Sequence, residues 1–248
     1  MHATAELYLD LMKKILTNTI YEDPNTSPLQ PLSYMKQIRE NGQDWPLLAH
    51  TMIGMKRLDN LQYCIENVIF EGIPGDLIET GVWRGGAAIF MRAILKAYDV
   101  TDRRVLVADS FEGLPTPNPL QFPKDAGDRH HKHTYLAVPL EEVKANFERY
   151  GLLDEQVVFI KGWFRDTLPY VPADSLAVLR LDGDMYESTW DALTNLYMKL
   201  SIGGYIIIDD YKVVSGCRAA VEDFRRNHGI VDQMHEIDWA GMYWRRTL

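Results

Sequence analysis

The sequence predicts a doubly wound α/β fold, built on a mostly parallel, seven-stranded sheet. Short apolar segments alternate with segments of helical periodicity from Gly75 onward. The short segments are apolar on both faces, which indicates strands of a parallel sheet that helices cover on both sides. The length agrees, since 248 residues suffice for one large core and are few for two.

The first predicted element is a helix at the N-terminus. Leu7, Leu11 and Ile15 recur at four-residue spacing, which is typical of an amphipathic helix of about four turns. This apolar stripe suits packing on a partner subunit and equally on the helix's own domain. We expect residues 1–70 to form a helical extension and residues 71–248 to form a single structural unit.

Strands and helices are then expected to alternate along the chain. The predicted strands are residues 76–80, 104–109, 156–161, 176–181 and 205–208. The predicted helices are residues 57–70, 87–98, 139–150, 186–200 and 215–227. Two short apolar runs follow and end near Trp244. Pro139 at a helix start supports the helical boundary there.

The composition disfavours several classes of function. Lys and Arg total 26 against 35 Asp and Glu, a formal net charge of −9, so the excess positive charge that binds nucleic-acid phosphates is missing. Cys64 and Cys217 fit neither a disulfide framework nor a zinc spacing. No apolar run approaches the roughly 18 residues of a membrane span, and charged residues interrupt the N-terminal segment. We therefore expect a cytoplasmic protein without nucleic-acid or membrane partners.

Ligands of open α/β sheets bind at the carboxyl ends of the strands, so the residues that follow each strand are the candidates. The first strand leads into a glycine-rich turn at residues 79–86, Glu-Thr-Gly-Val-Trp-Arg-Gly-Gly. The second ends in Asp109 and Ser110, and an acid at that point suits a ribose diol. The glycine spacing differs from the dinucleotide fingerprint, which argues against a nicotinamide dehydrogenase. It favours a nucleoside ligand such as S-adenosylmethionine (SAM) over an ordinary turn.

Acidic residues follow the fourth and fifth predicted strands. Asp182 and Asp184 come directly after the fourth, and Asp209 and Asp210 after the fifth. If the two strands are neighbours, these carboxylates meet in a small volume, where like charges require protonation or a cation. Oxygen ligands alone suit a hard ion, Mg²⁺ first, with Mn²⁺ and Ca²⁺ as alternatives. The competing interpretation is two surface turns, in which aspartates are common.

Four motifs, in the same order along the chain, resemble the macrocin O-methyltransferase family. They are Ile-Glu-Thr-Gly-Val-Trp-Arg-Gly-Gly at 78–86, Ala-Asp-Ser-Phe-Glu-Gly-Leu-Pro at 108–115, Leu-Asp-Gly-Asp-Met-Tyr-Glu-Ser-Thr at 181–189 and Gly-Gly-Tyr-Ile-Ile-Ile-Asp-Asp-Tyr at 203–211. Residues 51–58 resemble the segment that precedes the SAM motif in that family. Its members methylate sugar hydroxyls of macrolide and aminocoumarin antibiotics. The resemblance implies a SAM- and Mg²⁺-dependent O-methyltransferase of the class I fold, usually a homodimer, that acts on a small glycosylated acceptor.

The resemblance also implies roles for individual residues. Asp182, Asp209 and Asp210 match the metal ligands, and Asp184 matches the position of a general base. A sugar hydroxyl has a pKa of about 15–16, about 12 units above that of free Asp. The hypothesis is therefore that the metal acidifies the acceptor hydroxyl and Asp184 removes its proton before in-line methyl transfer. The cofactor-binding positions would be Thr51, Met52, Glu79, Thr80, Gly81, Trp83, Gly85, Gly86, Asp109, Ser110, Gly162, Trp163 and Asp182.

Other features leave alternatives open. His130, His131 or His133 could serve as the base in place of Asp184, although the charged residues around them favour a solvated polar loop. The long connection at residues 116–138 suggests a lid over the acceptor. Several large side chains could line an acceptor pocket, but simple packing is favoured for them. They are Tyr34, Met35, Trp45, Tyr211, Trp239, Tyr243 and Trp244.

Two further functions compete with sugar methylation. Catechol or phenolic O-methylation uses similar acids and a metal at strand ends. A nucleoside-binding module without catalysis is the non-enzymatic alternative. Clustered carboxylates argue against that alternative, because without a cation they would only destabilise the fold.

Overall fold

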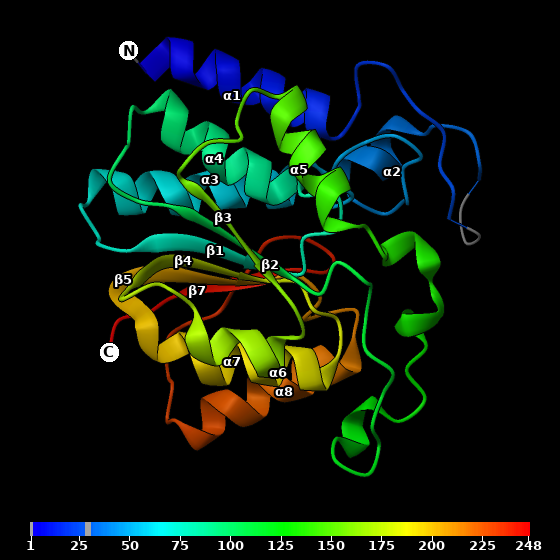
Figure 1. Cartoon of the computed structure of the whole chain (residues 1–248), viewed down its shortest axis with the longest axis vertical. Helices are drawn as coiled ribbons and strands as arrows, with labels where there is room; N and C mark the ends of the chain where they lie inside the picture. Colours follow the sequence, from blue (N-terminus) through cyan, green and yellow to red (C-terminus); the bar gives the residue numbers. More distant parts are fainter. Residues whose placement is uncertain (1, 28–30) are drawn as a thin grey trace.

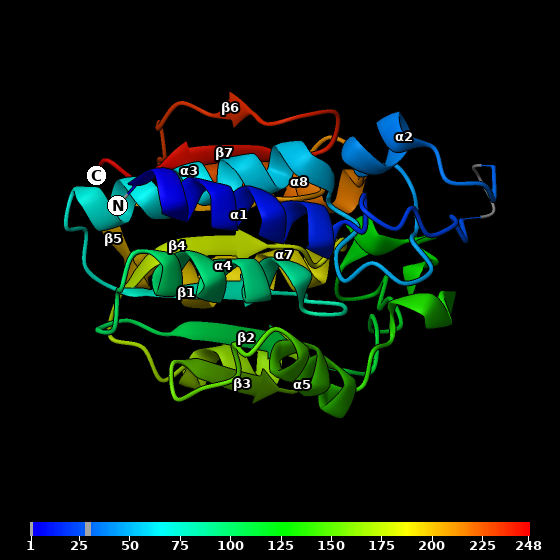
Figure 2. The ribbon, with the colours of Figure 1, turned by 90° about the horizontal axis from the view of Figure 1, so that it is seen from above.

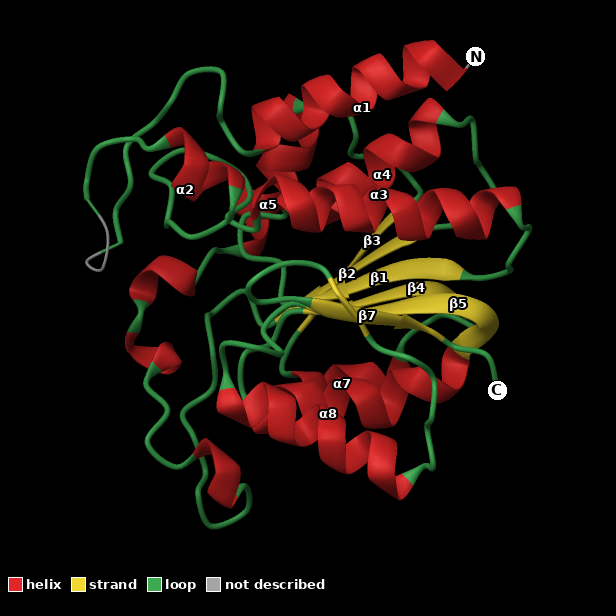
Figure 3. Cartoon of the chain, turned by 180° about the vertical axis from the view of Figure 1, so that it is seen from behind, coloured by secondary structure: helices red, strands yellow, loops and turns green. Residues whose placement is uncertain are grey.

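The computed structural model describes residues 2–27 and 31–248 and confirms the doubly wound α/β prediction. The described residues form a seven-stranded sheet in the order β3-β2-β1-β4-β5-β7-β6. Strands β1 to β5 are parallel, whereas β7 is antiparallel to β5 and β6 is antiparallel to β7. Figure 1 and Figure 3 show helices on both faces of this sheet, and Figure 2 shows β3 near one edge and β7 toward the other.

The strands and helices occupy the following bounds. The strands are β1 Asp76–Thr80, β2 Val105–Asp109, β3 Val157–Lys161, β4 Leu176–Leu181, β5 Leu200–Ile208, β6 His235–Glu236 and β7 Met242–Arg245. The α-helices are α1 His2–Leu16, α2 Lys36–Glu40, α3 Gly54–Phe70, α4 Gly86–Ala97, α5 Leu140–Arg149, α6 Phe164–Thr167, α7 Tyr186–Leu196 and α8 Ser215–Asn227. Short 3-10 turns are η1 Pro123–Asp125, η2 His130–Lys132, η3 Thr134–Leu136, η4 Leu168–Tyr170 and η5 Tyr197–Lys199. Within the described residues, no helix has the length and apolar character needed to cross a membrane.

The central strands separate two apolar cores. In β1, Leu77 belongs to the core with α1, α3, α4 and α5, while the next residue, Ile78, belongs to the core with α7 and α8. In β2, Val107 and Ala108 divide between the same two cores. Successive side chains of a strand point to opposite faces, so apolar residues at consecutive positions bury both faces of the sheet. This is the arrangement that the sequence pattern predicted.

Helix α1 packs through a different face from the apolar stripe predicted at Leu7, Leu11 and Ile15. Leu9 and Leu16 are fully buried in the same core as α4, against which α1 packs. Leu7, Leu11 and Ile15 remain 74%, 49% and 37% exposed. The helix therefore docks on its own chain and leaves one apolar edge outside, while the homodimer and the division of the chain into two units stay predictions.

The prediction was wrong at the junction of α7 and β5. The predicted helix extended to residue 200 and the predicted strand began at residue 205, but α7 ends at Leu196 and β5 begins at Leu200. Leu200 pairs with Leu176 across the sheet, with a register shift before the next pair. Gly203, at φ +89°, lies within this irregular start of β5. Residues 197–199 remain helical as η5, and pairing with β4 extends the strand over residues 200–204.

The register of β1, β4 and β5 brings their carboxyl ends level. Thr80 pairs with Leu181, and Leu181 pairs with Ile208. The ladder continues into the loops, since the N–H of Asp182 donates to the carbonyl of Thr80 and the N–H of Asp209 donates to that of Leu181, both at 2.9 Å. The acidic segments after β4 and β5 are therefore neighbours, as the metal hypothesis requires.

Candidate active site

A cavity of about 940 Å³ opens at the carboxyl ends of the parallel strands. Its walls are the loops after β1 to β5, the segment before α3 and the long loop between β2 and α5. Most of the residues that the sequence singled out line this cavity. They are Thr51, Met52, Glu79, Gly81, Trp83, Asp109, Ser110, Gly162, Trp163, Asp182, Asp184, Asp209 and Asp210. The candidates for cofactor, metal and base contacts therefore share one space.

Three of the predicted cofactor positions lie behind the cavity wall rather than on it. Within the described chain, Thr80, Gly85 and Gly86 are not among the lining residues. Thr80 is fully buried in β1. A Cβ at Gly86 would lie 2.2 Å from the carbonyl oxygen of His50, so this glycine lets α4 approach the segment before α3. These three residues do not line the cavity, and their contact with a cofactor stays a prediction.

Gly81 brings the loops after β1 and β4 together. Its φ is +84°, and a Cβ there would lie 1.7 Å from the carbonyl oxygen of Asp182. Only glycine accepts both the left-handed backbone and this approach. The two loops therefore meet between β1 and β4, where the order of the strands in the sheet changes direction. Open α/β sheets bind ligands at such a point.

Asp109 is held by backbone donors of two turns. One carboxylate oxygen accepts the N–H of Val82 at 2.7 Å, and the other accepts the N–H of Phe111 at 2.7 Å. Burial raises the pKa of Asp109, and these backbone hydrogen bonds oppose the rise. Each carboxylate oxygen can accept more than one hydrogen bond, so the fixed carboxylate retains capacity for hydroxyl groups in the cavity.

Glu79 is held by a buried arginine. Its Oε1 accepts from Nη1 of Arg180 at 2.5 Å, and within the described chain its Oε2 has no hydrogen-bond partner. Burial raises the pKa of Glu79 to about 8, although the Arg180 guanidinium lowers it. Arg180 therefore links Glu79, a predicted cofactor contact, to Asp182, which follows β4.

Asp182, Asp209 and Asp210, here called the acid cluster, form the candidate metal site. One oxygen from each lies within 4.8 Å of one from each of the other two. Burial, then the Asp209 carboxylate, raises the pKa of Asp182 to about 7, against the effect of Arg180. Burial, then repulsion from Asp184 and Asp182, raises the pKa of Asp210 well above its usual range. Within the described residues, Oδ2 of Asp210 is buried without a hydrogen-bond partner.

Two buried arginines balance part of this negative charge. Arg180 binds Asp182 at 2.8 Å and also pairs with one oxygen of Asp209. Arg57 pairs with the other oxygen of Asp209 and with Asp238, the latter at 3.1 Å. Sequence reasoning missed both arginines. The sequence could have indicated a role for Arg180, because a charged residue inside an apolar strand needs buried partners of opposite charge.

The fit of a divalent cation rests on three properties of these residues. The donor set consists only of carboxylate oxygens, which hard cations prefer. One of those oxygens is buried and unpartnered within the described chain. After burial, the carboxylates of Asp209 and Asp184 raise the pKa of Asp182, and those of Asp184, Asp182 and Asp209 raise the pKa of Asp210, an effect that a bound cation would reverse.

Asp184 and His130 lie beside each other on the cavity wall. Asp184 follows the acid cluster residue Asp182 by two positions and has a left-handed backbone at φ +55°. Its Oδ1 lies 3.9 Å from Nε2 of His130, and Nδ1 of His130 lies 2.7 Å from Oδ2 of Asp128. Burial raises the pKa of Asp184, and His130 lowers it. His130 therefore lines the cavity beside Asp184, and its role as a base stays a prediction.

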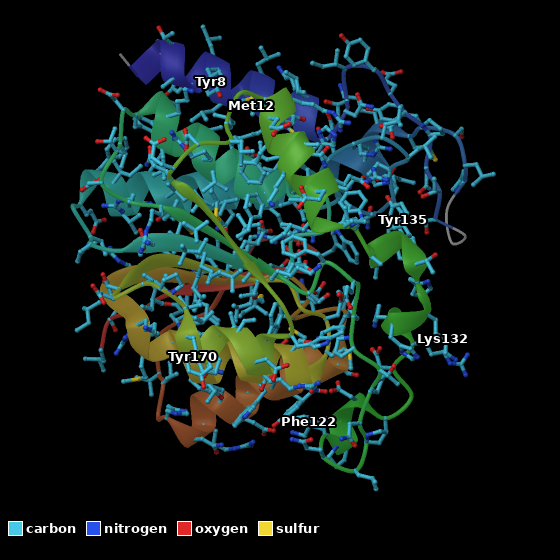
Figure 4. All side chains as sticks on the ribbon, in the orientation of Figure 1. Tyr8, Met12, Phe122, Lys132, Tyr135 and Tyr170 are labelled. Atoms are coloured by element: carbon cyan, nitrogen blue, oxygen red, sulfur yellow. The ribbon has the colours of Figure 1, made fainter. Side chains whose placement is uncertain are left out.

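The loop at residues 116–138 lines part of the cavity, and Figure 4 labels three of its side chains, Phe122, Lys132 and Tyr135. Both oxygens of Asp125 accept backbone N–H groups at the start of α7, from Tyr186 at 2.7 Å and Glu187 at 2.9 Å. Tyr135 stacks on Trp45 at 5.1 Å between ring centroids, and its carbonyl accepts from the indole of Trp83 at 2.9 Å. The loop thus bridges α7 and the N-terminal segment over the cavity.

The large side chains left open by the sequence divide into two groups. Trp45 and Trp239 line the cavity. Trp244 is fully buried in the core with α7 and α8, and Tyr243 packs against the opposite core. Within the described residues, Tyr34, Met35 and Tyr211 are absent from the cavity wall. Simple packing, which the sequence favoured, therefore describes only part of the set.

Comparisons with known proteins match nearly the whole chain. The family model described as Macrocin-O-methyltransferase (TylF) matches residues 25–246. A relative from Streptomyces olivaceus, 8-demethyl-8-(2,3-dimethoxy-alpha-L-rhamnosyl)-tetracenomycin-C 4'-O-methyltransferase, is 58% identical over 247 residues, which cover 98% of this chain and 93% of that protein. Demethyldecarbamoylnovobiocin O-methyltransferase of Streptomyces niveus is 53% identical over 253 residues, covering 99% and 95%. The solved structure of the O-methyltransferase NovP matches with a TM-score of 0.94 at 54% identity, covering 98% of this chain and 100% of that one.

Proposed function

Because this chain belongs to the macrocin O-methyltransferase (TylF) family and is a SAM-dependent O-methyltransferase, we propose that it methylates a sugar hydroxyl of a glycosylated natural product. The observation that carries the proposal is one cavity whose wall includes both the cofactor candidates and the acid cluster. The name of one relative specifies a rhamnosylated tetracenomycin as its acceptor, and that of another a novobiocin precursor. We infer a tailoring step in antibiotic biosynthesis.

The part of the cavity wall that the cofactor candidates form fits SAM. Asp109 would receive the ribose hydroxyls on the lone pairs that its two backbone hydrogen bonds leave free. Glu79 and Gly81 would border the methionine part, and Trp163 would offer an aromatic face to the adenine. When bound, SAM supplies the electrophilic methyl group.

The acid cluster fits a divalent cation, with Mg²⁺ as the first candidate. Asp182, Asp209 and Asp210 would hold it, and the arginines behind Asp209 would keep that carboxylate in place. When bound, the ion supplies positive charge that lowers the pKa of a nearby acceptor hydroxyl.

Asp184 would take the acceptor's proton. Its carboxylate lines the same cavity as the acid cluster, and burial gives it a higher pKa than a free aspartate, which makes it a stronger base. The surrounding loop would exclude water and hold the acceptor in line with the methyl group. Alignment of this kind can contribute up to about 7–11 kcal/mol.

A matched acceptor panel tests the proposal. Purified protein and SAM would be incubated with pairs of glycosylated and aglycone compounds, with Mg²⁺ or with EDTA. We expect methyl transfer to the glycosylated member alone, its loss in EDTA, and its recovery when Mg²⁺ is added back. Methylation of catechols in place of glycosides would overturn the sugar assignment.

The cofactor and the non-enzymatic alternative have their own controls. SAM, and not NAD, should raise the melting temperature of the protein, because a ligand that binds only the folded state stabilises it. Absence of methyl transfer to any diol, with or without Mg²⁺, would favour a nucleoside-binding module.

A further inference from the structure

The three histidines of the loop at residues 116–138 have different surroundings. His130 and His133 line the cavity, whereas within the described chain His131 is not among the lining residues. His133 packs its ring against Trp45, with centroids 5.2 Å apart in an edge-on arrangement. His130 alone lies between two carboxylates. The structure therefore separates one member of the group from the other two.

Asp128 fixes the orientation of the His130 ring. One Asp128 oxygen accepts the backbone N–H of His130 at 2.9 Å, and the other lies 2.7 Å from Nδ1. An ionised carboxylate only accepts hydrogen bonds, so Nδ1 carries the hydrogen and Nε2 keeps its lone pair. That lone pair is on the side of Asp184, whose Oδ1 is 3.9 Å away. An acid that orients a histidine toward a reacting group is a recurrent arrangement in catalysis.

We propose that His130, oriented by Asp128, is a positioning residue that takes over the proton which Asp184 removes from the acceptor hydroxyl. The inference rests on the proposed methyl transfer and adds the path of the proton. Its basis is the placement of the imidazole between Asp128, on its own loop, and Asp184, on the loop after β4.

The bonds and charges of the proposed steps balance. The acceptor O–H bond breaks, its proton forms an O–H bond on Asp184, and its electron pair remains on the acceptor oxygen for the new C–O bond. The electron pair of the broken C–S bond stays with sulfur. The proton then leaves Asp184 for Nε2 of His130, which forms an imidazolium beside the Asp128 carboxylate. Loss of that proton to water restores the starting state.

The charges around His130 support an imidazolium at this place. Burial alone lowers the pKa of His130, but the Asp184 and Asp128 carboxylates outweigh it and raise the pKa. The distance of 3.9 Å exceeds a hydrogen bond, and such contacts often shorten when substrate binds. The other titratable or charged groups on this side of the cavity are Asp125, His133, Asp182, Asp209, Asp210, Arg57 and Arg180.

The test compares His130→Asn with the matched control His131→Asn. Asparagine keeps an N–H donor near the position of Nδ1 for Asp128 but has no group at Nε2. Single-turnover methyl transfer would be measured between about pH 5 and pH 9, across the range in which histidine titrates. We expect His130→Asn to be about 100-fold slower near neutral pH. It should also lack the decrease in rate that wild type shows at low pH, where His130 is already protonated. His131→Asn should match wild type.

Two further measurements distinguish proton transfer from a structural effect. Imidazole added to the buffer should partly restore the rate of His130→Ala, because it can replace the missing ring. SAM affinity and melting temperature should stay near wild type in both His130 variants. Equal rates in His130→Asn and wild type, or a slower rate with an unchanged pH profile and no imidazole rescue, would overturn the inference. A wild-type protein that methylates no acceptor would instead overturn the proposed function, and this inference with it.

Discussion

Two acidic regions line the same cavity and are built in opposite ways. At the end of β2, both oxygens of Asp109 accept backbone N–H groups at 2.7 Å. At the ends of β4 and β5, the acid cluster places three carboxylates within 4.8 Å of one another, and its direct partners are guanidinium groups. Asp109 is held by neutral donors of the backbone, whereas Asp182 and Asp209 of the acid cluster are held by opposite charge.

The difference shows which of the two regions needs a ligand to be complete. Asp109 has a partner for each oxygen, so it positions two turns whether or not a cofactor is bound. In the acid cluster, Arg57 and Arg180 satisfy Asp209, while Oδ2 of Asp210 has no partner within the described residues. Replacement of each aspartate by asparagine removes one charge at nearly constant volume. A series of such variants therefore measures what each charge contributes in its own surroundings.

Asp184→Asn should have the largest effect on catalysis. An amide cannot accept the proton, so we expect the turnover number to fall by about 1,000-fold. The dissociation constant of SAM, measured by titration calorimetry, should remain within about twofold, because Asp184 is not among the predicted cofactor contacts. Comparable turnover in this variant and in wild type would eliminate Asp184 as the base.

Asp210→Asn should weaken Mg²⁺ binding by about 100-fold, as expected when a group that supports a metal site is lost. The same substitution should stabilise the protein in EDTA by about 1 kcal/mol, because burial and the neighbouring carboxylates disfavour the ionised Asp210, whose Oδ2 is buried without a hydrogen-bond partner among the described residues. Calorimetric titration with Mg²⁺ and thermal melting in EDTA measure the two effects.

The matched control for Asp210 is Asp209, whose two oxygens are already paired with arginines. Asp209→Asn should destabilise the protein in EDTA, since it leaves Arg57 and Arg180 with less counter-charge. Changes of the same sign in Asp209→Asn and Asp210→Asn would show that pairing with arginine does not distinguish the two carboxylates.

Asp109→Asn should act on the cofactor side with a smaller effect. An asparagine has one acceptor oxygen, so one of the two backbone N–H groups would face an amide donor, at a cost of about 1–3 kcal/mol in the free energy of unfolding. We expect SAM to bind about tenfold more weakly, which corresponds to about 1.4 kcal/mol. The melting temperature should fall, opposite in sign to Asp210→Asn. An unchanged melting temperature would contradict the structural role given to these hydrogen bonds.

Much of this comparison could be predicted from the sequence, because the positions of the acids follow from the topology of the sheet. Parallel strands end at the same edge of a sheet, so acids such as Asp182 and Asp209 meet once β4 and β5 are neighbours. The position of Asp109 follows from the same rule. Local residue type and the alternation of elements were sufficient for these side chains.

Other features depend on contacts between segments that are far apart in the sequence. Arg57 reaches Asp209 across 152 positions, and Arg180 reaches Glu79 across 101. His130 and His131 are adjacent and of the same type, and only the path of the loop places one ring beside Asp184. Periodicity and spacing contain no information on such pairings, so the sequence located the site and left its charge balance and its histidine open.

Asp125→Asn should have the smallest effect of the series and extends the comparison to the loop. Asp125 resembles Asp109, since both its oxygens accept backbone N–H groups, here at the start of α7. Asparagine caps helices nearly as well as aspartate, so the loss should be limited to about 0.5–1 kcal/mol of charge interaction with the helix. Trypsin cleavage after Lys124, Arg129 or Lys132 should become about threefold faster, because the loop opens more often. SAM together with an acceptor should slow this cleavage in both proteins if the loop closes over the substrate. Equal cleavage rates in wild type and Asp125→Asn would show that contacts such as the stacking of Tyr135 on Trp45 hold the loop without help from α7.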